Sequence, residues 1–135
     1  EFMAGGTIED GEMAALQMVD ESAGATAVQA VNDLVAIGAA DVLLKQGLQI
    51  PRDISIAGFG NILISEHCRV PLTTVRQPKF RLGLAAIEAM LKLLRGQRPE
   101  TQRLSAELII RSSTGPPPAP TSEAGVNLPG GSAAP

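Results

Sequence analysis

The chain has 135 residues, of which 44% are hydrophobic and 19% charged, and its formal net charge is −3. This size and composition suit one domain with a modest core and exclude a chain that is disordered throughout. The 11 basic and 14 acidic residues form no runs, and no apolar stretch approaches the roughly 18 residues of a membrane span, so we expect neither a DNA-binding face nor a membrane contact.

The first predicted elements are a helix and a short strand. Thr7 or Asp10 can cap a helix that runs to about Asp20, where the sequence ESAGA breaks it. The run TAVQAV, residues 26–31, is rich in β-formers and predicts a strand. This strand ends at Asn32 and Asp33.

A second helix and a second strand follow. Asp33 is a natural N-cap for the segment LVAIGAADVLLKQ, and Gly47 is placed to end that helix. Pro51 stops any helical continuation, and ISIAG, residues 54–58, predicts a buried strand.

The last three elements are a strand, a helix and a strand. LTTVRQ, residues 72–77, predicts a short strand, and FRLGLAAIEAMLKLLRG, residues 80–96, has the clearest helical pattern in the chain. RLSAELIIRSS, residues 103–113, predicts the final strand. The alternation of strands and helices indicates an α/β fold with a parallel or mostly parallel sheet.

The two ends differ in character from this middle part. Glu1 and Phe2, before Met3, look like a remnant of an expression vector, so residues 1–3 are left out of the fold. Residues 115–135 contain most of the prolines and few large apolar side chains, which predicts a disordered tail.

Metal and cofactor sites are not expected. Cys68 is the single cysteine and His67 the single histidine, too few for the ligand set of a structural zinc site. The glycine-rich stretches lack the spacing of nucleotide-binding loops. We therefore predict no metal and no cofactor.

Polar and aromatic residues stand where three predicted strands end. Ligands of parallel α/β sheets bind beyond the carboxyl ends of the strands. Those positions hold Asn32, then Phe59, Gly60 and Asn61, and finally Gln77. None of them is an acid, a base or a nucleophile, so the sequence predicts a binding site and no enzyme.

Four stretches together form a specific signature. They are AVQAVNDLVAIGA, GLQIPRDISIAGF, PLTTVRQP and LGLAAIEAMLKLL, and in this order and spacing they resemble the C-terminal part of the lactose-repressor (LacI/GalR) family of bacterial transcription regulators. The resemblance implies a periplasmic-binding-protein-like fold: two doubly wound subdomains with an effector between them, behind a helix-turn-helix headpiece.

The resemblance also implies that the chain is partial. Residues 4–77 would be part of the C-terminal subdomain, and residues 78–114 would be a crossover helix and a final strand. The helix near residues 80–95 would then expose the apolar face that normally packs on the other subdomain. We expect this surface to favour self-association.

The strand-end residues acquire roles from the family, with structural alternatives left open. Asn32 is expected to contact the effector and also to cap a helix. Phe59 stacks on an effector or plugs the end of the sheet, and Gln77 lines the cleft or stabilises the hinge. Gly60 departs from the family, which commonly has aspartate there, so we hypothesise a cleft floor that has lost its carboxylate, with Asn61 as the nearest polar substitute.

The expected function is effector sensing and dimerisation in a cytoplasmic LacI-type repressor. The partners would be a small-molecule effector, sugar-like or another metabolite, and a second copy of the chain, with Ile37 and Cys68 at the dimer interface. DNA would be bound only through a headpiece that this chain lacks, and no membrane is involved. The alternative is a periplasmic-type solute-binding protein for transport, which shares the fold.

Overall fold

The computed structural model describes residues 5–21 and 24–117. The predicted remnant at residues 1–3 lies outside this part, as does the tail from residue 118 onward. Helices and strands follow in the order α1 (Ile8–Glu21), β1 (Ala27–Gln29), α2 (Asp33–Lys45), β2 (Ser55–Ala57), α3 (Ile64–His67), β3 (Thr74–Arg76), α4 (Lys79–Leu94) and β4 (Glu107–Ile109). The short helix α3 is the one element that the sequence pattern did not predict.

The strands form two pairs that a single bridge connects. β1 and β2 pair in parallel, with Val28 opposite Ile56. A parallel bridge between Ala57 and Thr73 continues this sheet toward β3. β4 pairs with β3 in the antiparallel sense. The mostly parallel α/β architecture is confirmed, and the final strand is its antiparallel edge.

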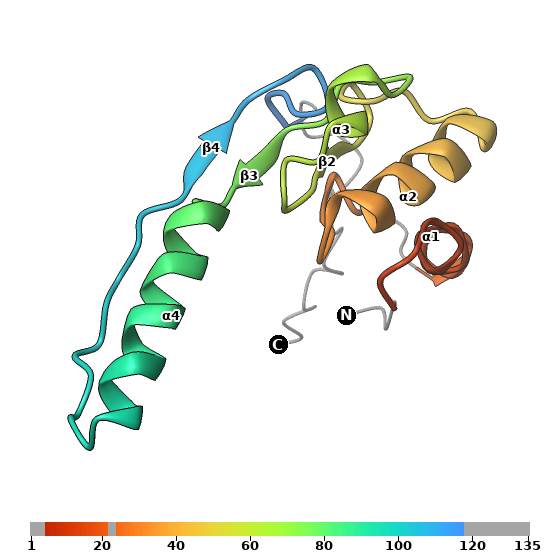
Figure 1. Ribbon diagram of the computed structural model, residues 1–135. Helices are drawn as coiled ribbons and strands as arrows, with labels where there is room; N and C mark the ends of the chain where they lie inside the picture. Colours follow the sequence, from red (N-terminus) through yellow and green to blue (C-terminus); the bar gives the residue numbers. More distant parts are fainter. Residues whose placement is uncertain (1–4, 22–23, 118–135) are drawn as a thin grey trace, which may run out of the picture.

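The molecule has a packed body and a projecting arm (Figure 1). The body consists of α1, α2, β1, β2 and α3, whereas β3 leads into α4, which extends away from it, and the chain returns alongside α4 to β4. The buried core lies in the body and in the segment just before β3, and its members are Ala15, Ala30, Val35, Ala36, Ala39, Val42, Leu43, Ile54, Ile56 and Leu72. No residue of α4 is buried. No helix among the described residues is long and apolar enough to cross a membrane.

Two glycines let α1 and α2 approach each other closely. A Cβ built on Gly11 of α1 would overlap the backbone carbonyl of Val35 in α2. A Cβ on Gly38 of α2 would in the same way overlap the backbone carbonyl of Ile8 in α1. The two helix backbones are therefore in contact where each contributes a glycine, which fixes α1 against α2.

Thr7 caps α1, as one of the two predicted alternatives. The Thr7 hydroxyl accepts a hydrogen bond from the Asp10 backbone N–H at 3.2 Å, and the Asp10 carboxylate accepts one from the Thr7 backbone N–H at 2.9 Å. This reciprocal arrangement satisfies two amide groups that the first turn of a helix leaves free.

Acid is expected to weaken the start of α1. The backbone N–H and hydroxyl of Thr7 lower the pKa of Asp10 below its ordinary value of 3.8. A carboxylate with a lowered folded-state pKa stabilises the fold above its unfolded pKa, and this stabilisation is lost as the pH falls through the folded pKa. We expect Asp10→Asn to flatten the pH dependence of unfolding below about pH 4, measured by urea denaturation at several pH values.

A matched variant makes this experiment specific. Asp20→Asn removes a carboxylate from the exposed last turn of the same helix. If both variants change the acid profile equally, the Thr7–Asp10 contact is not the cause.

Candidate functional site

The ends of β1, β2 and β3 meet at one edge of the molecule. The backbone N–H of Asp33, just after β1, donates to the Phe59 carbonyl at 3.2 Å. The N–H of Gly60 donates to the Val75 carbonyl in β3 at 2.9 Å. Because the strands run in parallel up to this point, these bonds bring the start of α2, the turn of residues 58–61 and the exit of β3 side by side.

Asn32, not Asp33, is the N-cap of α2, which corrects the prediction made for Asp33. The Asn32 Oδ1 atom accepts a hydrogen bond from the Val35 N–H at 2.9 Å. Its Nδ2 group donates to the Gly6 carbonyl at 3.0 Å, which ties the segment before α1 to the same edge. Asn32 thus has a structural role, and one amide hydrogen and one lone pair remain for a ligand.

Asp33 is buried and joins all three strand ends. Its side chain is 1% exposed. One carboxylate oxygen accepts a hydrogen bond from the Thr74 hydroxyl in β3, and the other accepts one from the Ile62 N–H at 2.8 Å. A Cβ on Gly58 would collide with this carboxylate, so the turn after β2 passes directly over it.

The turn after β2 presents Phe59 and shapes Gly60. The Phe59 side chain is 38% exposed, so part of its ring faces solvent at this edge. Gly60 has φ = +132°, a conformation that disfavours any residue with a Cβ. A Cβ there would lie 3.6 Å from Oδ2 of Asp33. An aspartate at position 60 would therefore be strained in this turn and would stand beside a second carboxylate.

Asn61 is held by a residue that the sequence analysis missed. The Asn61 backbone has φ = +47°, and its Oδ1 accepts a hydrogen bond from the Arg111 guanidinium at 2.9 Å. Arg111 also donates to the Leu72 carbonyl at 2.8 Å, and its side chain is only 13% exposed. An arginine 50 positions farther along the chain carries no local signal of this contact, so only the fold reveals it.

Gln77 follows β3 at the same edge, and its carbonyl accepts a hydrogen bond from the Lys79 N–H at 2.8 Å. This bond starts the turn into α4, so Gln77 stands at the joint between body and arm. The edge thus offers amide groups, one aromatic ring and a buried carboxylate that is already hydrogen-bonded. Such groups suit a neutral polar ligand. Among residues 5–21 and 24–117, no three His, Cys, Asp or Glu side chains gather as a metal site.

Ile37 and Cys68 lie together at a different place. Both line a cavity of about 210 Å³ between α1, α2 and the loop after α3. The Cys68 thiol donates toward the Val70 carbonyl at 3.1 Å, so the thiol is held within that loop. Glu12, Asp41 and Arg69 also line this cavity. An apolar depression with charged neighbours is a suitable surface for another protein.

Comparison with known protein families gives one match over nearly all of the described chain. Residues 1–114 match the family described as periplasmic binding protein-like domain. The HTH-type transcriptional repressor CytR of Escherichia coli (strain K12) is 39% identical over 110 residues, which cover 80% of this chain and 32% of CytR. The HTH-type transcriptional repressor PurR of Aliivibrio fischeri (strain MJ11) is 36% identical over 97 residues, covering 70% of this chain and 29% of PurR. The chain spans about a third of the length of these repressors.

Solved structures show the same relationship. The lac repressor dimer bound to operator and the anti-inducer ONPF superposes with a TM-score of 0.73 at 31% identity, covering 80% of this chain and 38% of that one. A LacI family transcriptional regulator from Arthrobacter sp. FB24 in complex with lactose gives a TM-score of 0.71 at 29% identity. This match covers 84% of this chain and 44% of that one. The transcriptional regulator CelR in complex with cellobiose gives a TM-score of 0.74 at 28% identity, and the match covers 79% of this chain and 33% of that one.

Proposed function

This chain belongs to the family of periplasmic binding protein-like domains, in the form found in LacI-family regulators, and on that premise we propose that it is the effector-sensing and dimerising region of a transcriptional repressor. It would bind a small polar molecule at the edge where β1, β2 and β3 end. In this proposal the chain acts by binding and not by catalysis, in the cytoplasm, and DNA is contacted through a headpiece outside this chain.

The observation that carries the proposal is the joining of three strand ends into one surface. Asp33 connects the start of α2, the turn of residues 58–61 and β3 through two hydrogen bonds. A ligand that contacts this edge therefore touches segments that one buried side chain holds in fixed positions. In this proposal, ligand binding at this surface changes the conformation at Gln77, where the arm begins.

The relatives support the function of a transcriptional repressor more than that of a transport protein. CytR and PurR are named as transcriptional repressors, and two of the three solved regulators are in complex with lactose or cellobiose. A periplasmic-type solute-binding protein has the same fold, but no relative reported above is one. We therefore propose a sugar or a similarly polar metabolite as the effector class.

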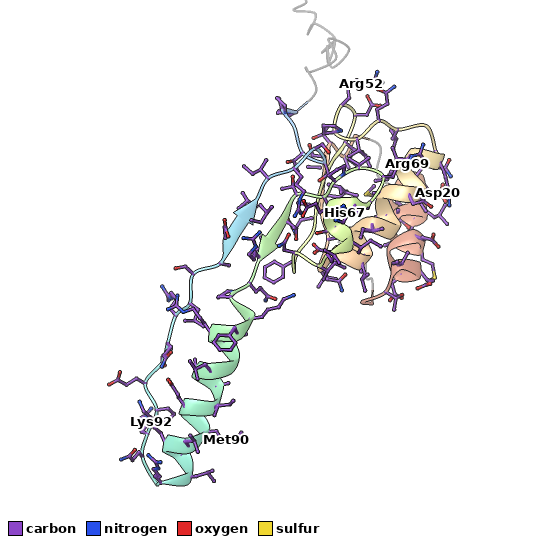
Figure 2. The ribbon with its side chains drawn as sticks, turned by 45° about the horizontal axis from the view of Figure 1, so that its top comes forward. Asp20, Arg52, His67, Arg69, Met90 and Lys92 are labelled. Atoms are coloured by element: carbon purple, nitrogen blue, oxygen red, sulfur yellow. The ribbon has the colours of Figure 1, made fainter. Side chains whose placement is uncertain are left out.

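Phe59→Ala is expected to weaken effector binding about tenfold, because the exposed part of the ring would be covered by the effector at about 25 cal/mol per Å², and a loss of about 1.4 kcal/mol is tenfold. Calorimetry with lactose, cellobiose and sucrose on the full-length protein would measure this. Met90→Ala is the control, because Met90 is 63% exposed and lies toward the far end of the arm, away from the strand ends (Figure 2).

Two outcomes would contradict the proposal. Equal losses in both variants would show that Phe59 is not a specific contact. Absence of binding by all three sugars would remove the sugar-sensing form of the proposal.

We further propose that the surface around Ile37 and Cys68 pairs two copies of the chain. The cavity at that surface supports this assignment, because its lining also includes the apolar residues Ile8, Leu44 and Val70. A pair formed there would be isologous, since the same surface is used on both copies.

A further inference from the structure

The Arg111 guanidinium connects three segments of the body. Its Nη1 group donates to the Leu72 carbonyl at 2.8 Å and to the Ser65 hydroxyl at 3.3 Å. Its Nη2 group donates to Oδ1 of Asn61 at 2.9 Å and lies 3.6 Å from the Glu66 carboxylate. The turn after β2, the short helix α3 and the segment before β3 therefore meet at one side chain. A guanidinium suits this position because its donors point in several fixed directions.

The backbone that carries Arg111 is itself held in place. The Arg111 N–H donates to the Thr73 hydroxyl at 2.9 Å. Two positions later Ser113 is fully buried, and its hydroxyl donates to the Ile56 carbonyl at 2.6 Å and accepts from the Thr73 N–H at 2.8 Å. The Ser113 carbonyl accepts from the Ile56 N–H at 2.8 Å. Arg111 therefore reaches the turn after β2 from a fixed base.

The contact with Arg111 also fixes how Asn61 presents its amide. A guanidinium has donors and no acceptor, so only the oxygen side of the Asn61 amide can face it. The Nδ2 group and its two hydrogens are left for other partners, and Asn61 is only partly buried. Its backbone has φ = +47°, which asparagine tolerates better than most residues. Asn61 is thus set as a hydrogen-bond donor.

We propose that Arg111 is a positioning residue of the effector site, an assignment that rests on the effector-sensing function proposed above. Arg111 holds the turn of residues 58–61 in one conformation, and it makes Asn61 a donor to an acceptor oxygen of the ligand, such as a hydroxyl or carbonyl oxygen. A guanidinium that only stabilised the body would contribute the same stability with or without the Asn61 side chain. The two roles therefore predict different results when both residues are changed.

Amide hydrogen exchange, followed by NMR on the full-length protein, tests the positioning without any ligand. The probes are the N–H groups of Gly60 and Ile62, which flank Asn61 and whose hydrogen bonds involve neither substituted side chain. Arg111→Ala and Asn61→Ala are each expected to raise the two exchange rates about tenfold, because each removes the same charged hydrogen bond. The double variant should exchange within about threefold of either single variant, whereas independent effects would multiply to about 100-fold.

Two further arginine variants complete this experiment. Arg52→Ala is the matched control: the Arg52 side chain lies 2.9 Å from the Asp53 carboxylate, but it is 67% exposed and stands before the start of β2, at the opposite end of the strands (Figure 2). It should leave both exchange rates unchanged. Arg111→Lys keeps the charge but cannot hold several acceptors at once, so it should raise the rates about threefold. If Arg111→Ala does not fold, the same cycle is run with Arg111→Lys.

Calorimetry tests the donor role of Asn61. Asn61→Asp keeps an acceptor for the Arg111 guanidinium but replaces the amide donor by a carboxylate oxygen. The exchange rates of Gly60 and Ile62 should therefore stay within about twofold of the original values. Binding of lactose, cellobiose or sucrose, whichever binds the unchanged protein, should weaken at least about tenfold. A variant that keeps the turn and loses the ligand separates contact with the effector from stability.

The possible failures are distinguishable. Exchange rates that multiply in the double variant would show that Arg111 and Asn61 act independently and would overturn the positioning role. An Asn61→Asp protein that binds its sugar as tightly as the unchanged protein would overturn the donor role. Absence of binding by all three sugars would remove the sugar-sensing function, while the exchange experiment, which needs no ligand, would still decide whether Arg111 positions the turn.

Discussion

Replacement of Gly38 by alanine is expected to destabilise the protein by about 3 kcal/mol, because overpacking against a backbone forces two helices apart. The new methyl group would overlap the Ile8 carbonyl, and a carbonyl cannot move aside as a flexible side chain can. Gly11→Ala should have a similar effect through the Val35 carbonyl. For a body of this size the expected fall in melting temperature is at least about 10 °C, measured by circular dichroism.

The double variant and a matched glycine test the mechanism. Once one alanine has separated α1 from α2, the second methyl group meets less overlap. The double variant Gly11→Ala/Gly38→Ala should therefore lose less free energy of unfolding than the sum of the losses in the two single variants. Gly83→Ala places the same methyl group on an open helix surface and should stabilise α4 by about 0.5–1 kcal/mol. A loss of stability in Gly83→Ala equal to that in Gly38→Ala would show that close helix contact is not the cause.

Asp33→Ala is expected to cost about 3 kcal/mol, because each buried polar group left without a partner costs about 1–3 kcal/mol. The variant leaves the Thr74 hydroxyl proton and the Ile62 N–H without an acceptor beneath the turn of residues 58–61. It should also weaken effector binding, since Phe59 and Gly60 lose the carboxylate that positions their turn.

Chemical denaturation and calorimetry on the same variants would check both parts of this prediction. Asp20→Ala is the matched control, because Asp20 is exposed near the end of α1 (Figure 2) and its removal should change stability by less than about 0.5 kcal/mol. The stability of Asp33→Asn should lie between those of Asp33→Ala and Asp20→Ala, since an amide keeps one acceptor oxygen. An Asp33→Ala protein as stable as Asp20→Ala would contradict the role assigned to the buried carboxylate.

The sequence by itself determined the order of the main elements and the family. The helix of residues 80–96 was predicted from the spacing of its apolar residues, and the structure forms it over Lys79–Leu94. The strand ISIAG was predicted from a short apolar run between turn residues, and β2 forms within it. These signals are local, because neighbouring residues alone set helical or extended periodicity.

The candidate site was only partly predictable. The rule that ligands bind at strand ends selected Asn32, Phe59, Gly60, Asn61 and Gln77, and the first four do lie around the start of α2 and the turn after β2. Within this set, the cap by Asn32 was expected and is confirmed, but Asp33 was expected to be a cap as well. Asn32 caps α2 whereas Asp33 turns inward, and both residue types favour the cap position equally, so sequence preference could not separate them.

Only the tertiary structure decided the contacts between distant segments. Arg111 meets Asn61, Gly11 meets the backbone of α2, and β4 joins β3 in the antiparallel sense, although long stretches of chain separate each pair. Periodicity and capping preference depend on neighbours along the chain, whereas these contacts depend on where whole elements pack. For this reason the sequence determined which elements form and which family they belong to, and the packing of those elements decided which side chains face the site, which support it and which surface of α4 stays open.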